Sequence, residues 1–137
     1  MERTTATHHP KDLMKTAIVV FADPSTNTEE ALGRLFNSLF LTWELKQKGQ
    51  EVALIFQGAG TRWASEVVRP DHPAHALYAL VADKVAGVCG GCADVFGARE
   101  KATAAGAKLV RETMIPGTSG VIDLSRYLDE GYRLVTM

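Results

Sequence analysis

Two kinds of hydrophobic pattern alternate along the chain. After a polar first residue, 16–21 and 51–56 are continuous runs of apolar side chains, a pattern typical of strands that are buried on both faces of a parallel sheet. Between these runs, the apolar residues of 32–43 recur at helical spacing, and Gly49 follows as a helix stop. The first third of the chain therefore predicts a strand, a long helix and a second strand.

The start of that helix has a capping signature. Thr26 is followed three positions later by Glu29, and we expect the pair to form a capping box that satisfies free amide groups of the first turn. Asp23 and Glu29 are also candidate catalytic carboxylates, but helix capping accounts for both of them.

Alternation of strand and helix continues through the rest of the chain. A short strand is expected at 85–88, followed by a helical stretch over 93–105 that Gly97 can interrupt. The other expected elements are a turn at 57–60, a helix opened by Asp71, His72 and Pro73, a strand at 108–111, a last helix capped by Ser119 or Asp123, and a closing strand at 132–136.

This order of elements predicts a single α/β domain. We expect a parallel sheet of about five strands, with helices on both faces and right-handed crossovers, over residues 16–137, and a flexible arm over 1–15. Ligands gather at the carboxyl ends of the strands in such folds. The segments expected to meet there are 23–28, 57–63, 89–92 and 114–119.

Composition narrows the classes of function. The 137 residues are 46% hydrophobic and 23% charged, the balance of one globular domain, and the formal net charge is −1. A chain without excess basic charge is not built to bind nucleic acid or an anionic membrane surface. No apolar stretch is long enough to span a bilayer. We expect a cytoplasmic protein, with no nucleic acid or membrane partner and no cofactor.

The stretch Val88-Cys89-Gly90-Gly91-Cys92-Ala93 carries the strongest chemical signal. Cys89 falls where the third strand hands over to a helix, and the two glycines allow a tight turn. The free amide groups of a helix start favour a thiolate at this position. We therefore expect Cys89 to be the reactive thiol.

Other interpretations of the two cysteines remain open. They fit a turn packed by small side chains, and Cys92 fits either a thiol that resolves intermediates on Cys89 or a core residue. Together with His72 and His75 they also match the ligand types of a zinc site. We favour the reactive thiol and predict no metal.

A ligand pocket is expected around the same strand ends. Arg62 is the best candidate for a cation near Cys89, although an ordinary solvated side chain also explains it. The glycines of 58–60 do not fit a dinucleotide loop, because Trp63 stands where a small residue is required. The pocket residues we expect are Asp23, Gln57, Gly58, Arg62, Gly90 and Gly91.

Taken together, these features resemble the DsrE-like (DsrE/DsrF/YchN-like) family of sulfur-handling proteins. The resemblance rests on the order of elements, the buried first strand, the long first helix that ends in Lys-Gly, and the cysteine at the end of the third strand, and it covers about residues 16–137. It implies a flavodoxin-like or YchN-like subunit, a persulfide on Cys89, sulfur donor and acceptor proteins, and a homo-oligomer, a trimer or a hexamer.

Three functions follow as hypotheses. The first is a sulfur carrier or sulfurtransferase that holds sulfane sulfur on Cys89. The second is a thiol-disulfide oxidoreductase in which Cys89 attacks and Cys92 resolves. The third is a non-catalytic subunit that binds a small ligand at the strand ends. A homo-oligomer is also expected from the first helix, because its apolar residues over 36–43 cover more than one face.

Overall fold

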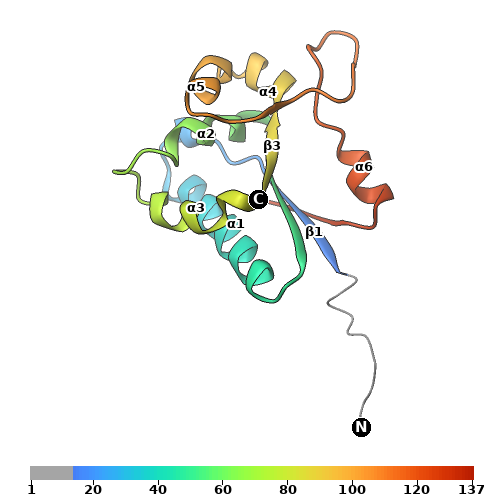
Figure 1. Cartoon of the computed structure of the whole chain (residues 1–137). Helices are drawn as coiled ribbons and strands as arrows, with labels where there is room; N and C mark the ends of the chain where they lie inside the picture. Colours follow the sequence, from blue (N-terminus) through green and yellow to red (C-terminus); the bar gives the residue numbers. More distant parts are fainter. Residues whose placement is uncertain (1–13) are drawn as a thin grey trace.

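The computed structural model describes residues 14–137, which form one five-stranded sheet with all strands parallel. The strand order is β4-β3-β2-β1-β5 (Figure 1), and the expected α/β class is confirmed. The elements are β1 (Lys15–Val20), η2 (Pro24–Thr26), α1 (Glu29–Gln47), β2 (Glu51–Phe56), η3 (Gly58–Arg62), α2 (Trp63–Glu66), α3 (His75–Val81), η4 (Ala82–Lys84), β3 (Val85–Cys89), α4 (Gly90–Val95), α5 (Arg99–Ala104), β4 (Leu109–Val110), α6 (Leu124–Asp129) and β5 (Arg133–Thr136), where η marks a 3-10 helix.

The two strands predicted from continuous apolar runs are the centre of the sheet. β1 and β2 pair over their whole length, from Lys15 opposite Glu51 to Val20 opposite Phe56. Every residue of β2 after Glu51 is buried, as expected for a strand covered on both faces. The expected arm over 1–15 lies outside the described residues except for its last two positions, and Lys15 already belongs to β1.

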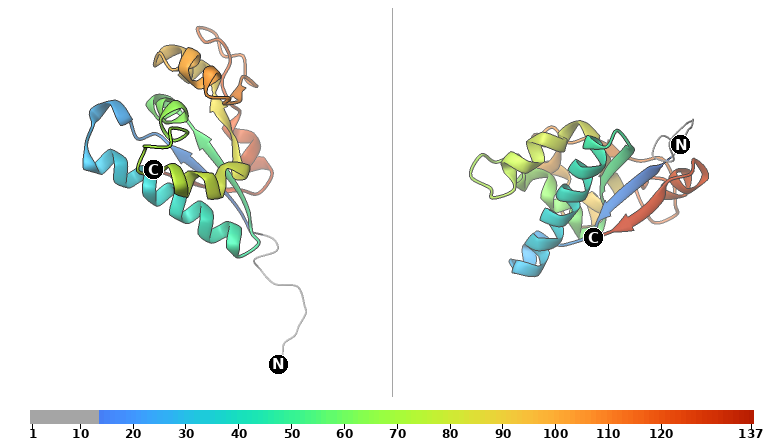
Figure 2. Two further views of the ribbon diagram at one scale, coloured as in Figure 1. Left: turned by 60° about the vertical axis from the view of Figure 1, so that its left-hand side comes forward. Right: turned by 90° about the horizontal axis from the view of Figure 1, so that it is seen from below.

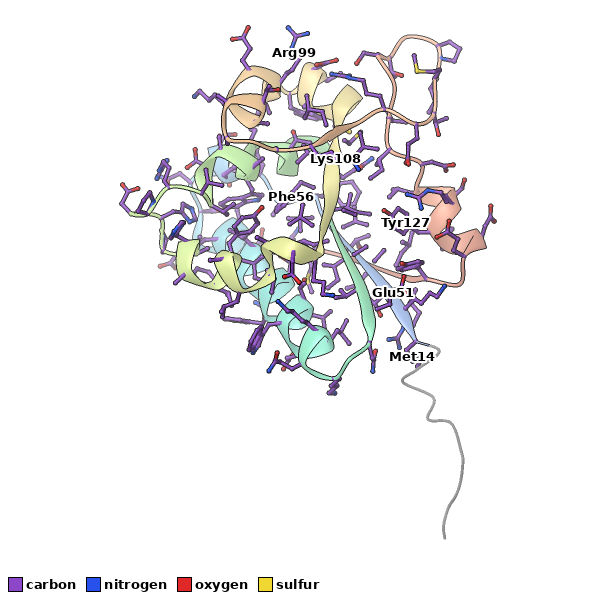
Figure 3. All side chains as sticks on the ribbon, in the orientation of Figure 1. Met14, Glu51, Phe56, Arg99, Lys108 and Tyr127 are labelled. Carbon is purple, nitrogen blue, oxygen red and sulfur yellow. The ribbon has the colours of Figure 1, made fainter. Side chains whose placement is uncertain are left out.

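The two faces of the sheet are covered unequally. Alternate side chains such as Ile18 and Phe56 pack under α1, α2, α3 and α5, whereas Val19 and Ile55 face the opposite way, toward Tyr127 of α6. Figure 2 shows α1, α2 and α3 gathered on one side of the strands, and Figure 3 shows Phe56 and Tyr127 on opposite sides. Helices therefore lie on both faces, but the α6 face carries one helix of six residues.

The cap of α1 differs from the expected one. Thr28, not Thr26, is the N-cap, and its hydroxyl accepts a hydrogen bond from the amide of Ala31 at 3.1 Å. Thr26 belongs to η2, where its hydroxyl donates to the carbonyl of Asp23. The capping-box prediction was wrong because Asp23 caps a separate 3-10 turn by accepting from the amide of Ser25, and this turn absorbs the residues that precede the helix.

Several other boundaries moved by a few residues. Residues 71–74 form turns and α3 begins at His75, residues 58–62 form a 3-10 helix rather than a simple turn, and β4 is only two residues long. Asp123, one of the two expected caps, accepts from the amide of Arg126 at the start of α6. The interruption expected at Gly97 separates α4 from α5. In the described part of the chain, no helix has the length and apolar character needed to cross a membrane.

The corrected cap generates a stability prediction. Thr28→Ala should lower the free energy of unfolding by about 1 kcal/mol, because the amide of Ala31 loses its partner. Thr26→Ala is the matched control and should cost less than half as much, since it removes no helix cap. Urea unfolding followed by circular dichroism measures both values. Equal losses, or a larger loss for Thr26→Ala, would contradict the assignment of Thr28.

Candidate functional site

The two cysteines lie together at the carboxyl end of β3. Cys89 is the last residue of the strand and the N-cap of α4, and Cys92 follows in that helix. Cys89 is 0% exposed and belongs to the cluster on the α6 face, whereas Cys92 is half-buried at the edge of that cluster. The two residues approach within 3.2 Å of each other. The thiol expected to be reactive is therefore the more deeply buried one.

The two glycines between them are required by close contacts. A Cβ atom on Gly90 would lie 2.5 Å from Cγ of Arg111, and one on Gly91 would lie 2.9 Å from the carbonyl oxygen of Gly120. The amide of Gly91 donates a hydrogen bond of 2.7 Å to that same carbonyl. Any side chain at either position would force the neighbouring segment away. The turn is thus built for close approach, as its sequence indicated.

Cys92 is held in its protonated form. Burial, together with a hydrogen bond to Cys89, raises the pKa of the Cys92 thiol to about 11, although a hydrogen bond from the backbone amide of Gly58 acts in the opposite direction. A hydrogen bond that raises the pKa of a thiol is one in which that thiol is the donor. Cys92 is therefore the donor of this hydrogen bond, and the sulfur of Cys89 is its acceptor.

Arg62, the expected cation, forms a separate cluster with Asp23. Its Nη1 lies 3.0 Å from both carboxylate oxygens of Asp23 and 3.0 Å from the hydroxyl of Ser25, and its Nε donates to the carbonyl of Phe96. Burial acts to raise the pKa of Asp23, but the hydrogen bonds from Ser25 and Arg62 outweigh it and hold that pKa below its usual value. Asp23 and Arg62 thus stabilise each other.

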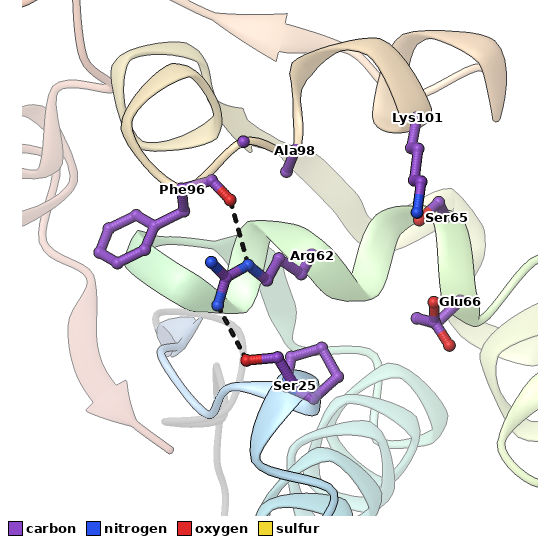
Figure 4. Close-up of a pocket in the computed structure, with 9 residues that line it drawn as sticks. Ser25, Arg62, Ser65, Glu66, Phe96, Ala98 and Lys101 are labelled. Atoms are coloured by element: carbon purple, nitrogen blue, oxygen red, sulfur yellow. Dashed lines mark hydrogen bonds between the residues drawn. The ribbon is translucent and has the colours of Figure 1, made fainter.

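A surface cleft of about 440 Å³ opens beside this ion pair. Figure 4 shows Arg62 between Ser25 and the carbonyl of Phe96, with Lys101 near Ser65 at the other end. Neither cysteine lines the cleft. Of the six expected pocket residues, Arg62 alone does so, with Asp23 bonded to it.

The remaining pocket residues lie nearer the cysteines. Gly58 contacts Cys92 through its amide, and Gly90 and Gly91 form the turn itself. The side-chain oxygen of Gln57 is buried without a hydrogen-bond partner among the described residues, and so it can accept one from a ligand. The structure therefore divides the expected pocket into a cysteine part and an Arg62 part.

A second arginine, which the sequence analysis missed, lies against the cysteine turn. Nη1 of Arg111 is 2.9 Å from Oδ2 of Asp94 and also bonds the hydroxyl of Ser119, which itself hydrogen-bonds Asp94. The hydrogen bonds from Arg111 and Ser119 lower the pKa of Asp94. Arg111 directly follows β4, and position at the carboxyl end of a strand was the signal that could have identified it.

The histidines considered as zinc ligands have other partners. Nδ1 of His72 accepts from the amide of Ala74 at 3.0 Å, and Nδ1 of His75 lies 2.9 Å from the carbonyl of Val67. Burial lowers the pKa of His72, which favours its neutral form. Within residues 14–137, no three His, Cys, Asp or Glu side chains gather in a group that could hold a metal ion.

Comparison with known proteins identifies the family of the chain. The model of the DsrE/DsrF-like family matches residues 14–137, which include every strand and both cysteines. The chain belongs to the DsrE/DsrF-like family. It is 31% identical over 124 residues to the uncharacterized protein MJ0733 of Methanocaldococcus jannaschii, an alignment that covers 90% of this chain and 96% of that protein. No solved structure matches the chain. Membership in this family suggests a role in sulfur relay.

The environment of Cys92 gives a prediction about its titration. In Cys89→Ala, the pKa of Cys92 should fall below its present value of about 11, because the hydrogen-bond and charge effects of Cys89 disappear. It should stay above the ordinary cysteine value, since burial remains. Thiolate absorbance against pH measures it. Cys89→Ser, which keeps a hydrogen-bond acceptor, should give an intermediate value. An unchanged pKa in Cys89→Ala would show that the two thiols do not interact.

Proposed function

We propose that this protein is a sulfur carrier that binds sulfane sulfur as a persulfide on Cys89. The observation that carries the proposal is the pairing of two unlike thiols at the end of β3. The pKa of Cys92 is about 11, and this thiol donates a hydrogen bond to Cys89, which leaves Cys89 as the thiol that we propose to attack the donor. A thiolate, not a thiol, is the nucleophile in sulfur transfer.

The proposed reaction needs no oxidant or cofactor. The thiolate of Cys89 attacks the outer sulfur of a donor persulfide, R–S–SH. A new S–S bond forms on Cys89 as the donor bond breaks, and the donor leaves as R–S⁻. In the second half, an acceptor thiolate attacks the outer sulfur on Cys89, takes it as a persulfide, and restores the thiolate of Cys89.

The state of Cys92 protects this intermediate. A thiolate at Cys92 would attack the inner sulfur of the Cys89 persulfide, close a disulfide and expel HS⁻. With a pKa of about 11, Cys92 is ionised in only about one molecule in ten thousand at pH 7. The persulfide on Cys89 therefore survives long enough to meet an acceptor protein.

A second candidate function is thiol-disulfide exchange, and the 3.2 Å approach of the two cysteines favours it. In this case Cys89 attacks a substrate disulfide and Cys92 displaces the mixed disulfide, so that the substrate is reduced and a Cys89–Cys92 disulfide forms. The high pKa of Cys92 makes that second step slow. We therefore place the carrier function first.

The carrier proposal has consequences for partners and location. It requires a sulfur donor and an acceptor, both of which we propose to be proteins, and a reducing compartment such as the cytoplasm, where thiolates persist. We also propose a homo-oligomer. Large apolar side chains are exposed over several elements of the described chain, and association would bury them. They include Phe21, Phe40, Leu80, Val95, Met114 and Leu128.

Paired serine variants test the two candidate functions. Cys89→Ser should abolish loading by a low-molecular-weight persulfide, because a serine hydroxyl is not ionised near pH 7. Cys92→Ser should load normally and hold the sulfur longer than the wild-type chain. Mass spectrometry measures loading as the mass added by one sulfur atom, and reduction of a model disulfide is assayed in parallel.

The outcomes separate the alternatives. Loss of disulfide reduction in Cys92→Ser, with mixed disulfides trapped on Cys89, would favour the oxidoreductase. Loading that survives in Cys89→Ser and fails in Cys92→Ser would reverse the assignment of the nucleophile. If neither variant changes either activity, the cysteine turn is structural and the ligand-binding subunit takes the place of the carrier.

The assembly prediction is independent of sulfur chemistry. Light scattering of the purified chain at micromolar concentration should give a mass of more than one subunit, because Phe40 and Val95 are exposed by 47% and 74% in the single chain. A Phe40→Glu variant tests whether the exposed face of α1 is part of the interface. A monomeric mass for the unmodified chain across this range would contradict the proposal.

A further inference from the structure

The loop between β4 and α6 forms a strap, defined here as residues 111–121, that runs beside the cysteine turn (Figure 1). Thr113 and Val121 pair as an antiparallel bridge, with N–H to O=C distances of 2.8 and 2.9 Å. At its tip, the amide of Thr118 donates to the carbonyl of Ile115 at 3.0 Å. These bonds lie within the strap, so they survive if it moves as one body.

The strap is held against α4 by few polar bonds. One is the hydrogen bond from the amide of Gly91 to the carbonyl of Gly120. The others are made by a latch, which we define as Asp94 of α4 together with Arg111 and Ser119 of the strap, both of which bond the Asp94 carboxylate. Because the Asp94 and Arg111 side chains are 24% and 29% exposed, water can replace their contacts when the latch opens.

The backbone of Gly120 is shaped for this contact. Its φ of +103° is a conformation that side chains rarely adopt, and a Cβ atom there would lie 2.8 Å from Cβ of Arg111 and 2.9 Å from the sulfur of Met114. Only glycine lets the chain turn here and aim its carbonyl at Gly91. The strap is therefore fitted to its closed position.

In that position Cys89 has no access to solvent. Its side chain is 0% exposed and shares a buried cluster with Val110 and Ile122, the residues that flank the strap. Val121 of the strap and Cys92 border the same cluster. Sulfur transfer requires a donor sulfur in line with the attacking thiolate, and no donor can reach a side chain that is fully buried.

We propose that the strap is a gate over Cys89, and that the Asp94–Arg111–Ser119 latch controls how often it opens. The gate proposal rests on the proposed function in one respect, namely that the sulfur of Cys89 is the atom that a donor or acceptor must reach. Opening breaks the bonds that join Asp94 to Arg111 and Ser119, and the Gly91–Gly120 hydrogen bond, whereas the internal bonds of the strap and the sheet pairing of β3 stay intact. A donor or acceptor can contact the sulfur of Cys89 only while the strap is open.

Alkylation of Cys89 by iodoacetamide tests the gate. The background is Cys92→Ala, so that one thiol remains, and the same protein unfolded in urea gives the rate for free access. In this background the folded protein should react more slowly than the unfolded one. Ser119→Ala should raise the rate about threefold and Asp94→Ala about tenfold, because each weakens the latch. The expected order follows from the number of latch bonds lost.

Two matched controls address general loosening of the fold. Ser125→Ala removes an exposed serine that hydrogen-bonds an aspartate outside the strap, and Asp83→Ala removes an exposed ion pair with Lys46. Neither should change the alkylation rate. If both controls accelerate alkylation as much as the latch variants do, access follows global opening and the gate is overturned.

Hydrogen exchange at the Gly91 amide distinguishes opening of the strap from an electrostatic effect of Arg111 on the reactivity of Cys89. Asp94→Ala removes the carboxylate partner of Arg111, and a change of charge beside a thiol alters its reactivity even if the strap stays closed. Opening exposes the Gly91 amide, so its exchange should accelerate in parallel with alkylation in both latch variants. Faster alkylation with unchanged exchange would overturn the gate, as would a folded protein that reacts as fast as the unfolded one.

Persulfide loading keeps the two proposals distinguishable. If Cys89 loads sulfur but alkylation is insensitive to the latch, the carrier proposal stands and the gate fails. If the latch controls alkylation but no sulfur is loaded, the gate stands over a cysteine with another function.

Discussion

The site depends on one close approach between backbone segments. The amide of Gly91 donates to the carbonyl of Gly120 over 2.7 Å, and no side chain fits at either residue without displacing its neighbour. This contact brings the loop after β4 onto the first turn of α4, which directly follows Cys89. The approach of Arg111 to Gly90 and the latch to Asp94 both depend on it, because each requires the two segments to touch.

Elements with strong local patterns could be predicted from the sequence. The apolar run at 51–56 forms β2 with the expected bounds. The third strand, expected at 85–88, also forms, and it extends one residue further to include Cys89. These patterns succeed because a strand buried on both faces tolerates few polar residues. The predicted cap of α1 was wrong because Thr26 and Thr28 are both suitable N-cap residues in the local sequence. The 3-10 turn that Asp23 caps includes Thr26, and so Thr28 becomes the N-cap.

The candidate site could be predicted only in part, for a similar reason. The position of Cys89 followed from the strand-to-helix transition, which is local information. Arg111 bonds Asp94 and Ser119, which are 17 and 8 residues away in the sequence, and no spacing rule links the three. Arg62 was the expected cation, yet Asp23 engages it from 39 residues away. Contacts between residues this far apart in the sequence depend on how the loops pack against one another, and the periodicity of hydrophobic residues carries no information about that packing.

The two cysteines differ because their environments differ, and this bears on why the cysteine that we propose to be reactive is buried. A persulfide is consumed by any thiol or oxidant that reaches it. A fully exposed Cys89 would load quickly and lose its sulfur as quickly to small thiols. A buried Cys89 beside a protonated Cys92 is protected from both the solvent and its own neighbour. Such protection is useful only if the site can open for a chosen partner. The strap keeps its own internal hydrogen bonds when it moves, whereas a strand that moved would lose its sheet pairing, and for this reason we propose the strap as the moving part.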